Sequence, residues 1–137
     1  MANYKISDIE GIGPAYQEKL KTAKVRSVTT LLKKGCNRQG RKELSQATGI
    51  DETLILKWVN MADLYRVKGV GSEYSELLEK AGVDTVKELR NRRADNLHSK
   101  MVEINSADRP LVRQLPGLKS VESWVSEAKK LEPMVTY

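Results

Sequence analysis

Aromatic, redox-active and metal-binding side chains are scarce in this chain. Its 137 residues contain no Phe, one Cys and one His, and aromatic residues make up 5% of the sequence. A core without Phe has to rest on Leu, Ile, Val and Ala, which suits packed helices. The single cysteine, Cys36, excludes an internal disulfide, and His98 alone cannot supply a ligand set for zinc. We therefore expect neither a metal site nor a cofactor.

Long apolar runs are also missing. No stretch approaches the roughly 18 apolar residues that a membrane span requires. The first ten residues, MANYKISDIE, show no charged segment followed by an apolar one, as a secretory signal would. We therefore expect a cytoplasmic protein that does not bind membranes.

Catalytic motifs are absent as well. The sequence contains no phosphate-binding loop G-x-x-x-x-G-K-[ST], no G-x-S-x-G elbow and no H-E-x-x-H zinc motif. The only histidine has no defined acidic partner. The sequence therefore predicts a protein that is not an enzyme.

Positive charge is the strongest feature of the composition. The chain has 24 Lys and Arg against 18 Asp and Glu, a net charge of +6, which favours an acidic partner. Residues 1–66 hold 12 basic and 7 acidic residues, whereas residues 67–137 hold 12 and 11. A basic run at residues 33–42 is either a solvated loop or a second phosphate contact, and spacing does not show on which side of the fold it lies.

A pattern with two glycines occurs twice. Residues 9–20, IEGIGPAYQEKL, are repeated 58 positions later as VKGVGSEYSELL, residues 67–78. Glycine allows positive φ and close approach to another surface, and a helix follows each pair at once. The amides at the start of that helix are unpaired and favour an anion such as phosphate. The alternative is that the glycines only form a tight connection between two helices.

Helical periodicity and capping residues extend over the rest of the chain, and no strand alternation competes with them. Ser27 and either Asp84 or Thr85 are predicted N-caps. The motif W-V-x-x-A at residues 58–62 recurs at residues 124–128, an offset of 66. We predict an all-α fold of two related units, residues 1–66 and 67–137. The segment between the two has no Gly, Pro or Ser linker, so we expect one compact body.

The segments I-x-G-I-G-P (residues 9–14) and V-x-G-V-G-S (residues 67–72) resemble the helix-hairpin-helix motif of DNA repair and recombination proteins. In that family the backbone amides of the hairpin hold a DNA phosphate without reading bases. Residues 47–101 also look like a bacterial family of tandem helix-hairpin-helix proteins catalogued only as a domain of unknown function. This resemblance implies two tandem helix-hairpin-helix (SAM-like) repeats. Many DNA-binding members have a small Ala where this chain has Gln17 and Ser75.

The first hypothesis for function is a sequence-independent DNA-binding module that grips backbone phosphates. We expect the contacts mainly at the first glycine turn (residues 11–13) and the two residues after it, because Glu73, Glu76 and Glu79 after the second turn would repel a phosphate. The predicted phosphate contacts are Gly11, Ile12, Gly13, Ala15, Lys19, Lys21, Lys24, Arg26, Lys33, Lys34, Arg38, Arg41 and Lys42.

The second hypothesis is a protein-interaction or scaffold module that keeps the fold without binding nucleic acid. Under either hypothesis we expect the second glycine turn and the residue after it to be structural, an interface between the halves or a protein contact; these residues are Gly69, Val70, Gly71 and Ser72. The two hypotheses differ in whether binding depends on Gly13 and Lys19.

Overall fold

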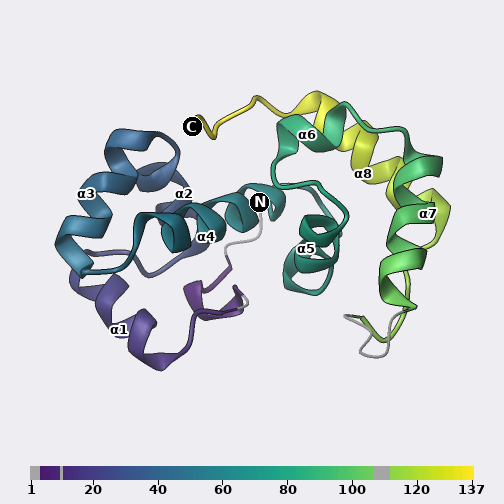
Figure 1. The fold of residues 1–137 in the computed structure, drawn as a ribbon. Helices are drawn as coiled ribbons and strands as arrows, with labels where there is room; N and C mark the ends of the chain where they lie inside the picture. The colour runs from purple at the N-terminus through teal and green to yellow at the C-terminus, as the bar shows by residue number, and fades with distance from the viewer. Residues whose placement is uncertain (1–3, 10, 107–111) are drawn as a thin grey trace. The chain divides into compact units, whose positions relative to one another are not determined.

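The structure is a computed structural model that describes residues 4–9, 11–106 and 112–137. This part of the chain is all-helical, as predicted, with a short 3-10 helix followed by eight α-helices (Figure 1). None of these helices is long and apolar enough to cross a membrane. The elements are η1 (Ile6–Asp8), α1 (Pro14–Thr22), α2 (Val28–Gly35), α3 (Arg38–Thr48), α4 (Glu52–Leu64), α5 (Gly71–Lys80), α6 (Val86–Arg90), α7 (Ala94–Asn105) and α8 (Leu118–Lys130).

The chain folds into two compact units. Unit 1 comprises Met1–Asp63 together with Met134–Tyr137, and unit 2 comprises Leu64–Pro133. The boundary predicted from the sequence lies after Arg66, and the predicted second unit includes the last four residues. In the structure those four residues instead belong with unit 1.

Unit 1 has an aliphatic core around one tryptophan. In this unit α3 packs against both α1 and α2, and α1 also contacts η1. Helix α4 contributes its apolar stripe, in which Ile55, Trp58 and Val59 are completely buried. The other buried side chains include Ile6, Ile9, Leu20, Val25, Leu31, Leu32 and Leu44.

In its described residues, unit 2 also packs four helices around one buried tryptophan. Helix α8 packs against both α6 and α7, and α5 packs against α7. Its core contains Leu64, Leu77, Leu78, Leu89, Met101, Val121 and Trp124, each at most 3% exposed. Each unit thus buries one tryptophan among aliphatic side chains, in place of the missing Phe.

The two glycine segments that repeat in the sequence form the same backbone hydrogen bonds. In the first, the Ile12 amide donates to the Ile9 carbonyl at 3.2 Å; in the second, the Val70 amide donates to the Val67 carbonyl at 3.2 Å. The equivalence continues at the next helix start, where Ser27 and Thr85 are the N-caps. The local conformation of the chain therefore repeats with the period seen in its sequence.

The ends of α1 and α5 also match. Each helix closes with a bond from an amide to the carbonyl five residues earlier, Val25 to Leu20 and Val83 to Leu78, both 2.9 Å. This closure needs a left-handed residue just before the valine. Gly82 supplies it in the second stretch with φ +91°, but Lys24 has to adopt φ +65° in the first.

Candidate nucleic-acid interface

The first glycine turn leads directly into α1 on an exposed surface. Gly13 is the N-cap, with extended φ −84° and ψ −177°, and Pro14 occupies the first helical position. The first turn of α1 contains no acidic residue. The amides of Gly13, Ala15 and Tyr16 donate to no acceptor in the described part of the chain, while the Gln17 amide donates to the Gly13 carbonyl at 2.9 Å. Unpaired donors at the positive end of a helix dipole form a site suited to an anion.

The turn is seated on a buried tryptophan. Gly11 has φ +94°, and a Cβ added there would lie 3.5 Å from the Trp58 Nε1 atom. The Tyr16 ring packs edge-on against the same indole, with ring centroids 5.1 Å apart. Trp58 is fully buried, and its Nε1 has no hydrogen-bond partner in the described residues. The indole and the tyrosine ring therefore pack against the turn on its buried side.

Ile12 does not belong among the ligand contacts that were predicted. Its side chain is 5% exposed. Its amide is already bonded to the Ile9 carbonyl. Ile12 anchors the turn in the core, and the residues available to a ligand lie on either side of it.

Exposed basic side chains flank α1. Lys19 and Lys21 lie on the helix, and Lys24 and Arg26 follow its C-terminus. The Lys19 Nζ atom lies 5.8 Å from the centroid of the Tyr16 ring, a distance at which a cation is attracted to the ring face. The nine residues of α1 span about 13 Å, so Lys21 and Lys24 lie at the end opposite to the open amides.

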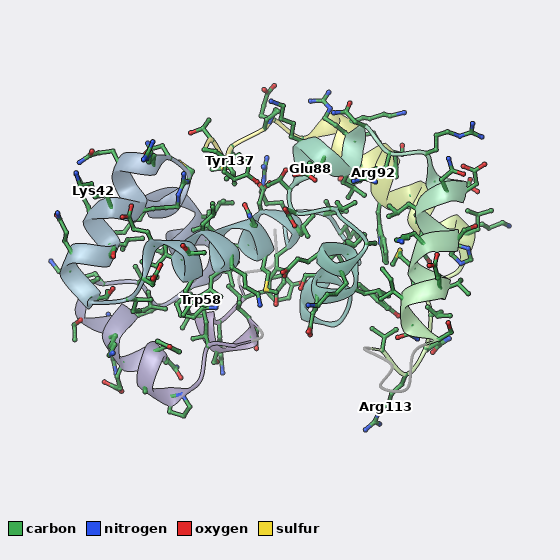
Figure 2. All side chains as sticks on the ribbon, viewed as in Figure 1. Lys42, Trp58, Glu88, Arg92, Arg113 and Tyr137 are labelled. Carbon is green, nitrogen blue, oxygen red and sulfur yellow. The ribbon has the colours of Figure 1, made fainter. Side chains whose placement is uncertain are left out.

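The basic run at residues 33–42 is divided in the structure. Lys33 is exposed. The Lys34 Nζ atom donates to the Ala23 carbonyl at 3.0 Å, which places it beside the C-terminal end of α1. Arg38 and Lys42 lie one turn apart on α3 and line a hollow of about 500 Å³. Figure 2 labels Lys42 beside α3, on the left of unit 1. Of these basic residues, Lys34 is the one with a hydrogen bond to the segment that follows α1.

Arg41 was predicted as a phosphate contact, and the structure shows a different role for it. It is 4% exposed, and its guanidinium donates to the Gly35 carbonyl at 2.9 Å and to the Thr136 carbonyl at 2.7 Å. Removal from solvent lowers the pKa of the guanidinium. Thr136 in turn donates its amide to the Cys36 carbonyl at 2.8 Å. Arg41 therefore joins α2, α3 and the last residues of the chain, and its donors are used inside unit 1.

The second glycine turn (residues 69–71) shares the tryptophan contact of the first. Gly69 has φ +93°, and an added Cβ would lie 3.1 Å from the Trp124 Nε1 atom. Tyr74 packs against the same indole, with centroids 5.3 Å apart, and Val70 is 1% exposed. The difference lies at the entry to the helix: Gly71 is already part of α5 and has φ +52°, whereas Gly13 is extended. The side chain of Ser72 lies outside the described residues.

The contact between a glycine and a tryptophan is the part of this arrangement that the sequence did not reveal. The step from Gly11 to Gly69 is shorter than the step from Trp58 to Trp124, so the two pairs do not share one period in the sequence. The recurring W-V-x-x-A motif is the available signal, and in the sequence it indicates only that the two units are related. Within the described residues no group of three His, Cys, Asp or Glu side chains is placed to hold a metal ion.

No solved structure matches this chain. A family model described as a domain of unknown function, DUF4332, matches residues 10–131, which include both glycine turns and both tryptophans. The chain therefore belongs to the DUF4332 family, as the resemblance to a family of unknown function had suggested.

Proposed function

We propose that this protein is a non-enzymatic, sequence-independent DNA-binding module made of two tandem helix-hairpin-helix repeats. The observation that supports it most is the start of α1, where the amides of Gly13, Ala15 and Tyr16 have no acceptor among the described residues and lie beside exposed glycine and proline. Such a helix start suits a phosphate group. The resemblance of the glycine segments to helix-hairpin-helix motifs adds DNA as the source of that phosphate.

The repeated geometry supports the tandem arrangement. In both units a glycine with φ near +90° lies against an indole nitrogen, and a tyrosine from the next helix packs on the same ring. The hydrogen bonds at the turns and at the helix ends also correspond. Two copies of one supersecondary unit would account for all of these equivalences.

The lysines around α1 suit contact with a phosphate backbone and not with bases. Their side chains are exposed and flexible, and each ammonium group acts as a point charge. Lysine lacks the planar pair of donors with which arginine reads the edge of a base. Each phosphate that is neutralised releases counterions, so affinity should fall steeply with salt. We therefore expect weak binding that is similar for duplexes of different sequence.

A titration of labelled DNA tests this proposal. Fluorescence anisotropy is measured for a labelled duplex and for its single strand, each at about 50 mM and about 200 mM salt. The proteins compared are the wild type and a triple variant that carries Lys19→Glu, Lys21→Glu and Lys24→Glu. We expect the triple variant to lose most of the affinity and to lower the salt slope by about 2 to 3. The control variant Lys80→Glu, Lys87→Glu, Lys100→Glu makes the same charge change at positions of unit 2 and should bind nearly as well. Absence of binding to either DNA at low salt would overturn the proposal. An equal loss of affinity in the triple variant and in the control variant would show that the lysines of α1 are not the binding site.

The alternative is a protein-interaction or scaffold module. It is favoured by the second glycine turn, which enters α5 differently, and by the exposed Leu118 and Val102 of unit 2. In that case binding of a partner would not respond to changes at Gly13 or Lys19. The same set of variants therefore separates the two functions.

A further inference from the structure

A groove follows one face of α8 in unit 2. It encloses about 530 Å³ and is lined by Leu118, Glu122, Val125 and Lys129 of α8 and by Arg92 and Arg93 of the segment before α7. Arg92 can be located in Figure 2 between α6 and α7. The α8 residues are spaced by three or four positions, so they share one face of the helix. From Leu118 to Lys129 that face extends over about 16 Å, or three helical turns.

The floor of this α8 groove is aliphatic. Leu118 is 40% exposed, and among the described residues only Val102 and Tyr137 are comparable exposed large hydrophobic side chains. Val125, which is 6% exposed, lies about two turns further along the same face. Among the described residues no aromatic side chain lines the groove, so these residues offer no platform on which nucleotide bases could stack. An aliphatic floor instead suits the apolar face of another protein segment.

The rim of the groove is basic. Arg93 donates to both carboxylate oxygens of Asp95, at 3.3 and 2.9 Å, and this pairing lowers the Asp95 pKa and cancels one charge of each sign. Arg92 donates to the Gly82 carbonyl at 2.8 Å and forms no ion pair with a described carboxylate. Lys129 forms no ion pair within the described part of the chain. Once the Arg93–Asp95 pair is set aside, the rim has two positive side chains, Arg92 and Lys129, and one negative side chain, Glu122, so its net charge is positive.

The groove is poorly suited to a phosphate or to a small molecule. At the start of α7 the Asn96 amide is already bonded to the Asp95 carboxylate at 2.8 Å, so a negative charge occupies the position that a phosphate would need. Most lining side chains are exposed, so a small ligand would stay largely in solvent instead of being enclosed. A protein segment about as long as the groove would cover more of its surface than a small molecule would.

We propose that the α8 groove docks a short amphipathic helix of a partner protein. Apolar side chains of the partner lie on Leu118 and Val125, and its acidic side chains face Arg92 and Lys129. A partner helix of about three turns matches the length of the groove. This interaction does not depend on DNA binding by unit 1.

A phage-displayed library of randomised helical peptides, selected on the full chain, tests this inference. We expect enrichment of peptides with aliphatic residues at helical spacing and with Asp or Glu beside them. One selected peptide is then labelled for anisotropy measurements. Leu118→Asp should weaken its binding about tenfold or more, and Lys129→Glu should weaken it less and reduce its salt dependence.

Matched controls separate the groove from general effects. Val102→Asp changes a side chain of nearly the same exposure on α7, and Lys100→Glu reverses an exposed lysine there, and neither should affect the peptide. Leu118→Asp places an acid in the first turn of α8, where the helix dipole favours it, so this variant should fold. Failure to enrich such peptides, equal binding to Leu118→Asp, or displacement of the peptide by a DNA duplex at the same face would each overturn the proposal.

Discussion

The two glycines of the first turn, Gly11 and Gly13, meet different structural requirements. Gly11 has φ +94° and lies against the Trp58 nitrogen, so both backbone conformation and space require glycine there. Gly13 has an ordinary extended conformation, and an added Cβ would meet no heavy atom within 4 Å. Backbone conformation and the space around a Cβ both allow a side chain at position 13, where it would lie beside the amides of the first turn of α1. Position 13 therefore offers a way to change the proposed phosphate site without disturbing the fold.

Gly13→Asp should separate stability from DNA binding. Aspartate is a better N-cap than glycine, and its charge suits the helix dipole, so we expect stability to rise by a few tenths of a kcal/mol. The carboxylate accepts from the same amides that a phosphate would use, so DNA affinity should fall about tenfold. Thermal unfolding and anisotropy measure the two effects. Gly13→Asn, which caps without a charge, should cost less affinity, and unchanged affinity in Gly13→Asp would contradict the proposed site.

Single residues also show where prediction from the sequence ends. Local signals predicted the cap at Ser27 and a second cap at Asp84 or Thr85, of which the structure shows Thr85, because the bonded amide lies only three residues away. Arg41 stands among exposed basic residues, and nothing near it in the sequence distinguishes it. Its second acceptor, the Thr136 carbonyl, lies 95 positions away and only the tertiary fold brings it close.

The C-terminal ends of α1 and α5 have the same hydrogen bonds but different residues at the left-handed position. Both helices close with the same hydrogen bonds, but one uses Lys24 and the other Gly82 at the left-handed position. A side chain in this conformation costs about 1 to 2 kcal/mol relative to glycine. The repeat was readable in the sequence because glycines and apolar positions recur, and Lys24 is a local exception that the backbone tolerates.

Exchanging these two residues should have opposite effects on stability. We expect Lys24→Gly to raise the free energy of unfolding by up to about 1 kcal/mol and Gly82→Lys to lower it by at least about 1 kcal/mol. In Gly82→Lys the added Cβ would also approach the Arg92 guanidinium, 3.2 Å away. Urea denaturation measures both. Lys24→Ala removes the charge but keeps the left-handed side chain, so a gain in Lys24→Ala as large as in Lys24→Gly would show that conformation is not the cause.

At the scale of the whole molecule, unit 1 is assembled from two distant parts of the chain. Residues 134–137 follow all of unit 2 in the sequence and nevertheless bind at the junction of α2 and α3. The contacts there use the main chain: the Thr136 amide and carbonyl bond to Cys36 and Arg41. Helical pattern and capping predicted the all-helical class, but main-chain contacts of this kind are independent of side-chain identity and left no signal in the sequence.

Removing the Thr136 amide should weaken unit 1 selectively. Thr136→Pro deletes the donor to the Cys36 carbonyl and disturbs the acceptor of Arg41, so we expect the free energy of unfolding of unit 1 to fall by about 1 to 2 kcal/mol. Each unit buries one tryptophan, so Trp124→Phe leaves fluorescence that reports on unit 1, and Trp58→Phe leaves a reporter for unit 2. Urea transitions are compared with and without Thr136→Pro in each background. Thr136→Ala, which keeps the amide, should have a small effect. A shift confined to the Trp58 signal agrees with a role inside unit 1, whereas an unchanged Trp58 transition would show that the last residues do not stabilise this unit.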